Sequence, residues 1–394
     1  MTIRILWAID KQFDVSVDRV TWLEAAGHLI QRGHQVLLVT GYKKSKTDFG
    51  LGACHRYVSA PAVRGLGSIL FSLNMLRVIT SCLRRFRPDV IIVDFLICIG
   101  VSPLIQLRRL LCPGVTWILD IRTIPVESYG IRAAMDRFLF RRALRTGGKH
   151  MHGILVISPF MKEVISKERC VHADRIGIWS SGVDTTLFDP ERVPEETIRS
   201  LREKWGLTDR FVVMYHGVLT GARGIRETIE AMEMVKADHP DMVLVLIGQG
   251  NALPALKSLV RERAMESCVV FVDTIPHEQV PSYIALCHAG ILPFPALMWW
   301  RVSSPIKLME YMAMGKPVIL SDIEAHRDVI KNRNQGIWIH DNRPETIAEA
   351  LRKTRTLGPA LHNMGRYGRK TAMRQYTWTK QIAQMDMAIQ SLKR

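Results

Sequence analysis

A lysine and a glutamate stand one helical turn apart, behind a serine–proline pair, in this chain of 394 residues. Ser304 followed by Pro305 is a typical helix start, and Gly315 is a typical helix stop. The first N–H groups of a helix have no partner within it, so they can bind an anion. Lys307 disfavours the helix start by its charge, and a bound phosphate would offset that cost. Lys307 and Glu310 therefore predict a site for a phosphorylated ligand, although a solvated ion pair is the alternative.

Two glycine-containing turns provide a second candidate site. The segment from Tyr215 to Ile225 carries Gly217 and Arg223 between an expected strand and an expected helix. Glycine lets the backbone approach a phosphate closely, and a guanidinium group binds phosphate in a bidentate manner. Gly248 and Gly250 follow the next expected strand. Neither turn has the spacing of a dinucleotide fingerprint or a P-loop, so a relaxed surface turn is the alternative.

The elements that would position these residues alternate along the whole chain. Short runs rich in valine and isoleucine alternate with longer helical patterns, which predicts parallel sheets covered by helices on both faces. A helix is expected from about Asp18 to Arg32, ended by Gly33. The expected strands are Ile3–Ile9, Gln35–Thr40, Asp89–Phe95, Val115–Ile121 and Gly153–Ser158 in the first half, and Phe211–His216, Met242–Gly248, Val269–Val272, Ala289–Pro293, Pro317–Leu320 and Gly336–His340 in the second.

The two series of strands meet near residues 178–210, where Asp189 and Pro190 begin a polar stretch typical of a linker. The chain is also longer than one hydrophobic core usually serves. We therefore expect an α/β protein with two doubly wound, Rossmann-like domains, residues 1–182 and 183–375. Ligands of such sheets bind at the carboxyl ends of the strands, so the two domains are expected to face a central cleft.

The net charge of +17 is unevenly distributed, because residues 1–150 hold 22 basic and 10 acidic residues. Such an excess favours phosphate-bearing partners such as anionic lipid, a lipid-linked diphosphate or nucleic acid. No basic–aromatic motif accompanies it, so no nucleic-acid partner is expected. The seven cysteines form no C-x-x-C pair. Their scatter argues against a disulfide framework or a zinc site and fits a reducing cytosol.

The stretch from Val90 to Leu107 is the best candidate for a membrane span. It contains Asp94, Gly100 and Pro103, so a buried strand, a loop and a helix start explain it better. The first ten residues are typical of a short buried strand rather than of a secretory signal.

Taken in order, these segments resemble the family-4 retaining glycosyltransferases of GT-B fold, over most of the chain and best in residues 205–330. The run from Ser303 to Val318 is similar to a polysaccharide-pathway subgroup with the motif Ser-Pro-x-Lys-Leu-x-Glu-Tyr-Met-Ala-x-Gly-Lys-Pro-Val. Two positions depart from the family pattern. Val218 replaces the first basic residue of the phosphate-binding turn, and Val302 replaces the first glutamate of the Glu-x7-Glu element.

The resemblance implies transfer of a sugar from a nucleoside-diphosphate-sugar donor, with retention at the anomeric carbon. Arg223, Lys307 and the helix start at Ser303 and Ser304 would stabilise the departing diphosphate. Glu310 would position the ribose. The remaining donor-binding residues would let the nucleotide lie against the backbone: Gly217, Gly248 and Gly250.

The resemblance also assigns the acceptor side to the first domain. The catalytic position falls on Asp120, at the end of an expected strand, where a carboxylate would orient a sugar. The final segment, residues 376–394, would form a helix that crosses back onto the first domain. GT-B enzymes stabilise the leaving diphosphate without a bound ion, so we expect no metal and no cofactor besides the donor. Two interpretations stay open, acceptor binding or a solvated loop, for three carboxylates near the first strand: Asp10, Asp14 and Asp18.

The expected partners are a nucleotide-sugar donor, a glycan or lipid-linked acceptor, and an anionic membrane surface. An expected helix between residues 131 and 145 is typical of peripheral membrane attachment, although an ordinary surface helix is the alternative. We therefore expect a cytoplasmic protein on the inner face of the cell membrane. The side chains that carry this expectation are Arg137, Arg141 and Arg145, beside Ile131, Met135 and Phe138.

Two rival functions are compatible with the same fold. One is a nucleotide-sugar epimerase, which binds the donor without an acceptor. The other is a non-catalytic binding protein whose donor site decayed at Val218 and Val302.

Overall fold

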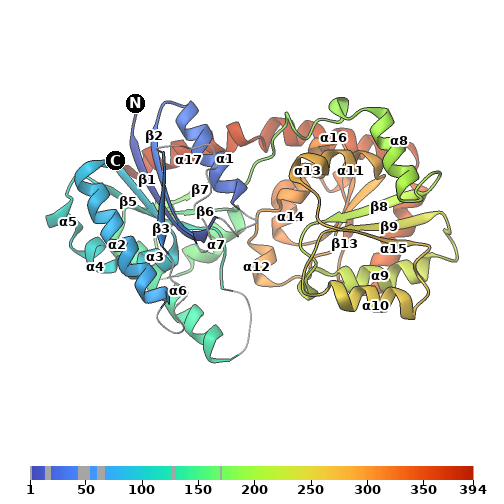
Figure 1. Ribbon diagram of the computed structural model, residues 1–394, viewed down its shortest axis with the longest axis horizontal. Coiled ribbons are helices and arrows are strands. Elements are labelled where there is room, and N and C mark those ends of the chain that lie inside the picture. The colour runs from blue at the N-terminus through green and yellow to red at the C-terminus, as the bar shows by residue number, and fades with distance from the viewer. Residues whose placement is uncertain are drawn as a thin grey trace. The chain divides into compact units, whose positions relative to one another are not determined.

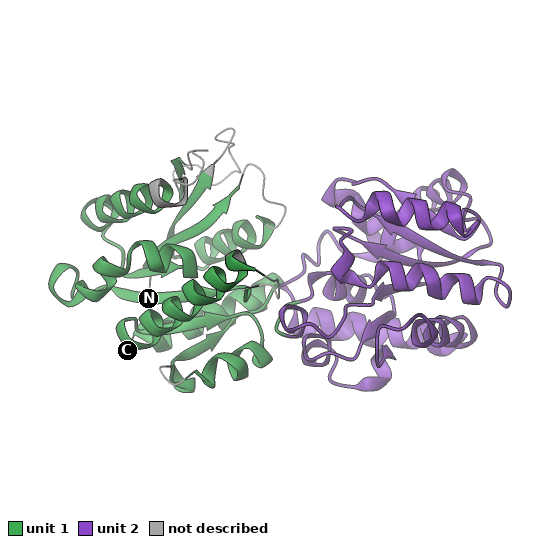
Figure 2. Cartoon of the chain, turned by 90° about the horizontal axis from the view of Figure 1, so that it is seen from below, with its two compact units in different colours: residues 1–181, 302–304, 378–394 green, residues 182–301, 305–377 purple. Residues whose placement is uncertain are grey.

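The computed structural model describes residues 2–13, 19–42, 54–59, 67–125, 130–168 and 171–393. The chain divides into two compact units, which Figure 2 draws in different colours. The boundary after Ser181 lies one residue from the predicted one, whereas nothing in the sequence indicates that residues 302–304 join the first unit. Unit 1 contains residues 1–181, 302–304 and 378–394, and unit 2 contains residues 182–301 and 305–377.

Unit 1 is built on a seven-stranded sheet in the order β3-β2-β1-β4-β5-β6-β7. All of its pairings are parallel, so the carboxyl ends of the strands share one edge. The strand order reverses at the neighbours β1 and β4, which is where doubly wound sheets bind ligands. The strands are β1 (Arg4–Gln12), β2 (Gln35–Tyr42), β3 (His55–Ser59), β4 (Val90–Val93), β5 (Thr116–Ile121), β6 (Gly153–Val156) and β7 (Ile176–Ile178).

Helices connect these strands (Figure 1). Every residue of β4, β5 and β6 is buried, as expected for strands covered on both faces. The helices are α1 (Val20–Gln31), α2 (Gly67–Arg85), α3 (Phe95–Gly100), α4 (Ser102–Gln106), α5 (Arg108–Leu111), α6 (Ile131–His150), α7 (Pro159–Ser166), the short 3-10 helix η2 (Ala173–Arg175) and the terminal α17 (Trp378–Lys393).

The terminal helix α17 belongs to unit 1, where it packs against α1 and β7. Its apolar side chains join the core cluster that also contains Trp7 and Trp179. Asp386 on α17 accepts a hydrogen bond of 3.0 Å from Arg32 Nε at the end of α1. The last 17 residues of the chain therefore complete the fold of its first half.

Unit 2 is built on a six-stranded parallel sheet in the order β10-β9-β8-β11-β12-β13. Its strand order reverses at β8, which lies between β9 and β11. The strands are β8 (Phe211–His216), β9 (Met242–Ile247), β10 (Val269–Val272), β11 (Ala289–Leu292), β12 (Val318–Ser321) and β13 (Ile337–Ile339).

The helices of unit 2 are α8 (Glu195–Lys204), α9 (Ile225–Val235), α10 (Leu253–Glu262), α11 (Val280–Leu286), α12 (Met298–Arg301), α13 (Ile306–Ala313), α14 (Glu324–Val329), α15 (Pro344–Thr356) and α16 (Pro359–Gln375). Four short 3-10 helices lie between them: η3 (Pro190–Arg192), η4 (Gly221–Arg223), η5 (His277–Gln279) and η6 (Arg333–Gln335). Apolar side chains of α9, α13 and α15 join one core cluster with the sheet.

The predicted alternation of strands and helices is confirmed. All six strands expected in the second half occur, whereas β3 and β7 of the first half were not expected. In the stretch from Val90 to Leu107 the expected strand occurs as β4 and the expected helix start as α4, whereas the helix α3 replaces the expected loop. In the described part of the chain, no helix is long and apolar enough to cross a bilayer. The expected helix start at Asp18 lies outside the described residues, and α1 begins at Val20.

The contact between α13 and α16 depends on a glycine. A β-carbon at Gly365 would collide with the carbonyl oxygen of Gly315, whereas one at Gly368 would make ordinary contacts with Met312. We predict that Gly365→Ala lowers the stability of unit 2 by about 1–3 kcal/mol, because overpacking forces backbone shifts. Gly368→Ala, in the same helix, should be neutral or stabilising, by up to about 1 kcal/mol.

Calorimetric unfolding of both variants measures this difference. Equal melting temperatures for the two variants would show that α16 does not approach the end of α13 this closely.

Candidate functional site

The carboxyl edge of the unit 2 sheet brings together three of the predicted residues. His216 is the last residue of β8, at the point where the strand order reverses, and Gly217 follows it. Lys307 and Glu310 lie on α13, the helix that follows β11 and the short α12. Side chains from these two neighbouring connections therefore meet at the edge where doubly wound sheets bind ligands.

Glu310 is a buried carboxylate held by two histidines. Its Oε2 accepts a hydrogen bond of 2.8 Å from His216 Nε2, and its Oε1 lies 3.3 Å from His277 Nε2. Tyr311 Oη lies 3.0 Å from the other ring nitrogen of His216. Burial alone would raise the pKa of Glu310, but the hydrogen bonds from both histidines outweigh it and hold that pKa well below its usual range. Glu310 is therefore ionised at neutral pH.

The two histidines differ in exposure and in charge. His216 is buried, and burial lowers its pKa in spite of the hydrogen bond to Glu310. The side chain of His277 is 42% exposed, and the hydrogen bond to Glu310 raises its pKa. Its ring also packs against Phe188 at 5.4 Å between ring centres. His277 is therefore the member of this cluster that solvent and ligands reach.

Lys307 lies over the turn that follows β8. A β-carbon at Gly217 would collide with Cε of Lys307, so this glycine makes room for the lysine. Burial, together with the nearby charge of Arg223, lowers the pKa of Lys307 to about 8. Two cations held this close favour a bound anion, because the anion would relieve their repulsion.

Arg223 is held in an aromatic corner beside this turn. Its guanidinium carbon lies 4.7 Å from the centre of the Trp300 ring and 5.6 Å from that of Phe294. It donates a hydrogen bond of 3.2 Å to Tyr215 Oη, whereas its buried Nε has no hydrogen-bond partner in the part of the chain that the structure describes. The stacked guanidinium therefore keeps donor capacity for a ligand.

Gly248 and Gly250 are required by the packing of the fold itself. The turn after β9 lies against the turn after β8, and the backbone N–H of Leu219 donates a hydrogen bond of 2.9 Å to the carbonyl of Gln249. A β-carbon at Gly248 would collide with the carbonyl of Gly217, and one at Gly250 with the carbonyl of Leu219. The close packing of two turns thus explains both glycines, whether or not a nucleotide lies beside them.

The predicted helix cap at Ser304 is wrong. The helix α13 begins at Ile306, its N-cap is Pro305, and no side chain caps it. Ser304 Oγ instead accepts a hydrogen bond of 3.0 Å from the backbone N–H of Ser181 and lies 2.8 Å from Ser180 Oγ. Its hydroxyl is engaged by residues far away in the sequence, which local pattern could not predict. The neighbouring Ser303 is partly buried in the same segment of unit 1.

Val302, where the family pattern has a glutamate, is fully buried, and its carbonyl accepts a hydrogen bond of 2.8 Å from Ser158 Oγ. Trp300 stacks on Phe294 and donates through Nε1 to the carbonyl of Ala222 at 2.7 Å. Arg301 donates through Nε to Glu324 at 2.8 Å. The side chains of Trp300 and Arg301 in α12 therefore pack on unit 2.

Asp120 lies near the carboxyl end of β5 in unit 1 and is buried. Its Oδ1 accepts a hydrogen bond of 3.0 Å from Trp179 Nε1. Burial raises its pKa to about 6, although Arg122 and the hydrogen bond from Trp179 act in the opposite direction. Arg122 lies over the Trp179 ring at 3.8 Å and donates to Ser181 Oγ at 3.2 Å.

A second carboxylate beside Asp120 was missed. Asp94 follows β4, caps α3 through a hydrogen bond of 2.9 Å from Ile97, and accepts another from the backbone N–H of Asp10. Burial and then the nearby charge of Asp10 raise the pKa of Asp94 to about 7. Its position directly after an apolar strand was the available signal. The other two carboxylates considered near β1, Asp14 and Asp18, lie outside the described residues.

His216 and His277 were also missed. His216 precedes a glycine turn that the sequence does single out, but His277 is 33 residues from Glu310 and stands in no motif. Only the packing of η5 and α13 brings it to the carboxylate.

No group of three histidine, cysteine, aspartate or glutamate side chains within the described residues is arranged to hold a metal ion. Six cysteines are described, and each is a free thiol. The expectation of a reaction without a bound metal stays a prediction.

The raised pKa of Asp120 predicts a pH dependence of stability. The unfolded chain releases this proton near its ordinary pKa of 3.8, before the folded chain does at about 6, so rising pH favours unfolding across that interval. Asn cannot ionise, and its amide oxygen can still accept from Trp179. Asp120→Asn should therefore gain stability relative to the parent between pH 4 and pH 7, by up to about 3 kcal/mol for a shift of roughly 2 units.

Denaturant unfolding of both proteins at a series of pH values measures the gain. Parallel stability curves from pH 4 to pH 7 would show that Asp120 is not a buried, proton-releasing group.

Comparison with known proteins identifies both halves of the chain. Residues 197–371 match the family model of the glycosyl transferases group 1, and residues 19–187 match that of Glycosyltransferase Family 4. Alpha-D-kanosaminyltransferase of Streptomyces kanamyceticus is 29% identical over 153 residues, which cover 39% of this chain and 38% of that protein. The putative glycosyltransferase YtcC of Bacillus subtilis is 23% identical over 61% of this chain and 60% of its own length. The match thus spans less than two thirds of either relative.

Solved structures of glycosyltransferases resemble this protein over nearly the whole length of its chain. HepE of Anabaena, solved with UDP and glucose, superimposes with a TM-score of 0.77 at 13% identity and covers 98% of this chain and 99% of its own. The two parallel-sheet units therefore form a GT-B fold, and the chain matches the models of two glycosyltransferase families, family 4 in its first half and group 1 in its second.

Proposed function

We propose that this protein is a retaining glycosyltransferase that moves a sugar from a nucleoside-diphosphate-sugar donor to a glycan or lipid-linked acceptor. The observation that carries the proposal is the arrangement of Lys307 beside Arg223 over the turn at Gly217, with the ionised Glu310 on the same helix. The match to two glycosyltransferase family models supports it. So does the shared fold with HepE, which was solved with UDP and glucose.

Lys307 and Arg223 would stabilise the leaving diphosphate. Negative charge grows on that group as the glycosidic bond breaks, and fixed cations in a partly buried site act on it without reorganisation. The lowered pKa of Lys307, about 8, still leaves it largely protonated at neutral pH. Neither residue needs a metal ion for this role.

Glu310 would accept the ribose hydroxyls. Each carboxylate oxygen accepts one histidine hydrogen bond and has a further lone pair for a hydroxyl. The two histidines fix the orientation of the carboxylate, and the partly exposed His277 lies at the side from which a nucleotide would arrive. Sugar recognition would not involve the position of Val302, because that side chain is apolar and buried.

Asp120 would orient the acceptor from unit 1. It lies near the carboxyl end of β5, and a pKa of about 6 leaves it mainly ionised at neutral pH. An ionised carboxylate accepts a hydroxyl hydrogen bond and can receive its proton. Asp94, at the end of the neighbouring strand, would share this role.

Alanine variants of the two donor-site cations test the proposal. Lys307→Ala and Arg223→Ala should each lower kcat/KM of glycosyl transfer by roughly 100- to 1,000-fold, as loss of one charge-stabilising donor does elsewhere. Lys353→Ala, an exposed lysine on α15, is the matched control and should leave the rate unchanged.

A thermal-shift screen with UDP-, GDP- and ADP-sugars first identifies the donor, since a bound ligand raises the melting temperature. Product analysis then separates transfer from epimerisation. Donor binding without any turnover would support the non-catalytic alternative and refute the proposed enzyme.

Helix α6 supports peripheral attachment to an anionic membrane, which we include in the proposal. Its first half exposes an apolar stripe, with Ile131, Met135 and Phe138 at 85%, 55% and 61% exposure. Arg141 and Arg145 are exposed further along the same helix. Its opposite face packs on α3. An exposed apolar stripe beside arginines is typical of a helix that lies in a lipid interface.

Co-sedimentation with phosphatidylglycerol-containing vesicles tests the α6 surface. Changing Arg137, Arg141 and Arg145 to glutamate should weaken binding by roughly 100-fold or more, because each basic residue near an anionic leaflet is worth about 1 kcal/mol. Binding should also fade as salt rises. Lys353→Glu with Lys370→Glu, both exposed in unit 2, serves as the control. Equal binding to neutral vesicles would refute this part of the proposal.

A further inference from the structure

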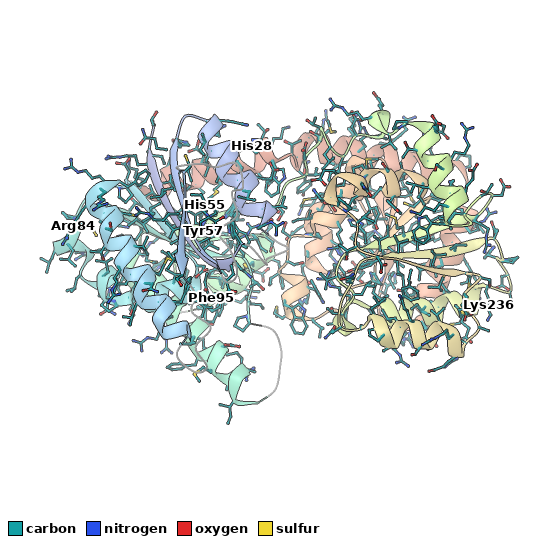
Figure 3. All side chains as sticks on the ribbon, viewed as in Figure 1. His28, His55, Tyr57, Arg84, Phe95 and Lys236 are labelled. Carbon is teal, nitrogen blue, oxygen red and sulfur yellow. The ribbon has the colours of Figure 1, made fainter. Side chains whose placement is uncertain are left out.

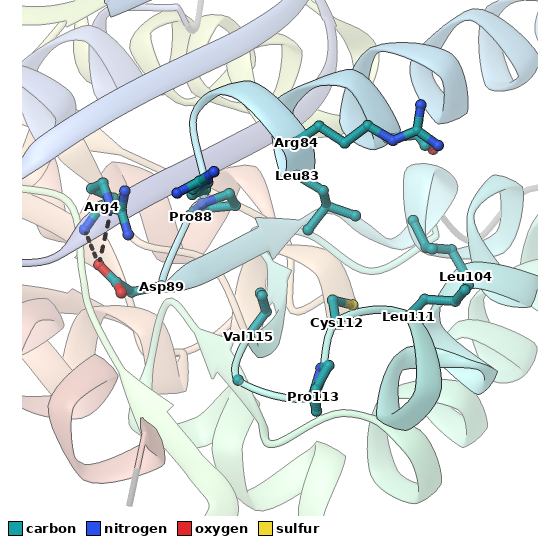
Figure 4. Close-up of a pocket in the computed structure, with 13 residues that line it drawn as sticks. Arg4, Leu83, Arg84, Pro88, Asp89, Leu104, Leu111, Cys112, Pro113 and Val115 are labelled. Carbon is teal, nitrogen blue, oxygen red and sulfur yellow. Dashed lines mark hydrogen bonds and ion pairs between the residues drawn. The ribbon is translucent and has the colours of Figure 1, made fainter.

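A cavity of about 440 Å³ opens in unit 1 at the edge of the sheet opposite Asp94 and Asp120 (Figure 4). Three of its lining residues mark the amino ends of strands. Arg4 begins β1, Asp89 precedes β4 and Val115 precedes β5. Because these strands are parallel, the cavity lies at the far end of the sheet from the strand-end carboxylates. It is therefore separate from the proposed transfer site.

The wall of the cavity is basic. Arg4, Arg84 and Arg87 line it together with a single acidic residue, Asp89. Asp89 is already engaged, because its Oδ2 accepts a hydrogen bond of 2.7 Å from the backbone N–H of Arg4 and lies 3.7 Å from Arg4 Nε. No ion pair joins Arg84 or Arg87 to a carboxylate of the described residues. Figure 3 labels Arg84 in unit 1, and Figure 4 shows its side chain extending away from Arg4 and Asp89.

Arg87 has an unusual backbone conformation just after the end of α2. It lies two residues past the last helical residue with φ of 49°. At the same place after α1, α8 and α13 the residue is a glycine with positive φ, as expected for a helix end: Gly33, Gly206 and Gly315. An arginine in this conformation strains the backbone. Ala264, after α10, is the comparable residue without a functional side chain.

An exposed apolar segment borders the cavity. Helix α5 has no buried residue, and its last residue, Leu111, lines the cavity. Leu107, Leu110 and Leu111 are 51%, 82% and 59% exposed, with Arg108 and Arg109 between them. Burial, and then the neighbouring charges of Arg109 and Arg175, lower the pKa of Arg108. Figure 1 shows α5 beside α4 in unit 1.

We propose that this cavity binds the phosphate headgroup of an anionic phospholipid while the leucines of α5 enter the acyl region beside it. The unneutralised arginines at the rim match a phosphate, and guanidinium groups bind phosphate in a bidentate manner. The three adjacent leucines distinguish a membrane from free phosphate, because a dissolved anion would leave them in water. The inference is independent of α6 and of the transfer reaction.

Arg87→Gly is the most informative variant, because misfolding cannot explain weaker lipid binding in a protein whose melting temperature rises. Glycine relieves the backbone strain, so the melting temperature of unit 1 should rise, while loss of the guanidinium weakens lipid binding roughly 5- to 10-fold. Ala264→Gly relieves the same strain in unit 2 and should raise the melting temperature without any change in lipid binding. If Arg87 had only a structural role, its replacement would not raise the melting temperature and weaken lipid binding at the same time.

Two further variants test the two halves of the site. Arg84→Glu should weaken binding to phosphatidylglycerol vesicles by roughly 10-fold or more, from the reversed charge. Leu110→Glu should do the same by removing an apolar anchor, and both residues are exposed, so folding is unaffected. Dihexanoyl phosphatidylglycerol, a soluble lipid, should bind the parent protein and raise its melting temperature.

Each outcome decides the proposal. Weakened vesicle binding in Arg87→Gly, Arg84→Glu and Leu110→Glu, with weaker binding of the soluble lipid in Arg87→Gly, supports it. If only the α6 arginine variant loses vesicle binding, the α5 cavity is not a lipid site. Inorganic phosphate binding as tightly as the soluble lipid, with Leu110→Glu unchanged, would show an anion site without a membrane. Binding of an acidic peptide but of no vesicle would show a protein partner instead.

Discussion

Unit 2 depends on a single buried charge, the carboxylate of Glu310. A carboxylate taken out of water must be paired, or it takes up a proton instead. His216 at the end of β8 and His277 in η5 supply that pairing, so three connections of the sheet are tied to one side chain. The same requirement fixes α13 against β8, which brings Lys307 over Gly217. The position of the cation thus follows from the pairing of the anion.

The fold could be predicted from the sequence because parallel sheets buried on both faces leave a strong pattern. Strands such as β4 and β9 are continuous apolar runs, and a polar residue or a glycine stands at each end. The strands that escaped prediction lack this signal. β3 (His55–Ser59) is largely polar and lies at a sheet edge, and β7 (Ile176–Ile178) has three residues. Their neighbours in the sheet define them, rather than their own sequence.

The candidate site could be predicted only where local chemistry decides it. Lys307, Arg223 and Glu310 stand in recognisable segments, and the structure places them at one sheet edge, but their roles stay predictions. Ser304 shows the limit, because a serine before a proline has the pattern of a cap while its hydroxyl bonds to Ser181, 123 residues away. Gly248 shows a second limit. The sequence pattern assigns this glycine to a bound nucleotide, whereas the neighbouring turn at Gly217 already leaves no room for a side chain there.

Acidic and basic side chains of unit 1 gather at opposite edges of its sheet, which its composition does not show. A parallel sheet has two chemically different edges, and here the carboxyl edge carries Asp10, Asp94 and Asp120, while arginines surround the amino edge. An excess of positive charge spread evenly would attract an anionic surface to any face. Separated edges instead favour one orientation, because the acidic edge is repelled by the surface that attracts the basic one. The sheet thus gathers buried carboxylates at one edge and places arginines at the other.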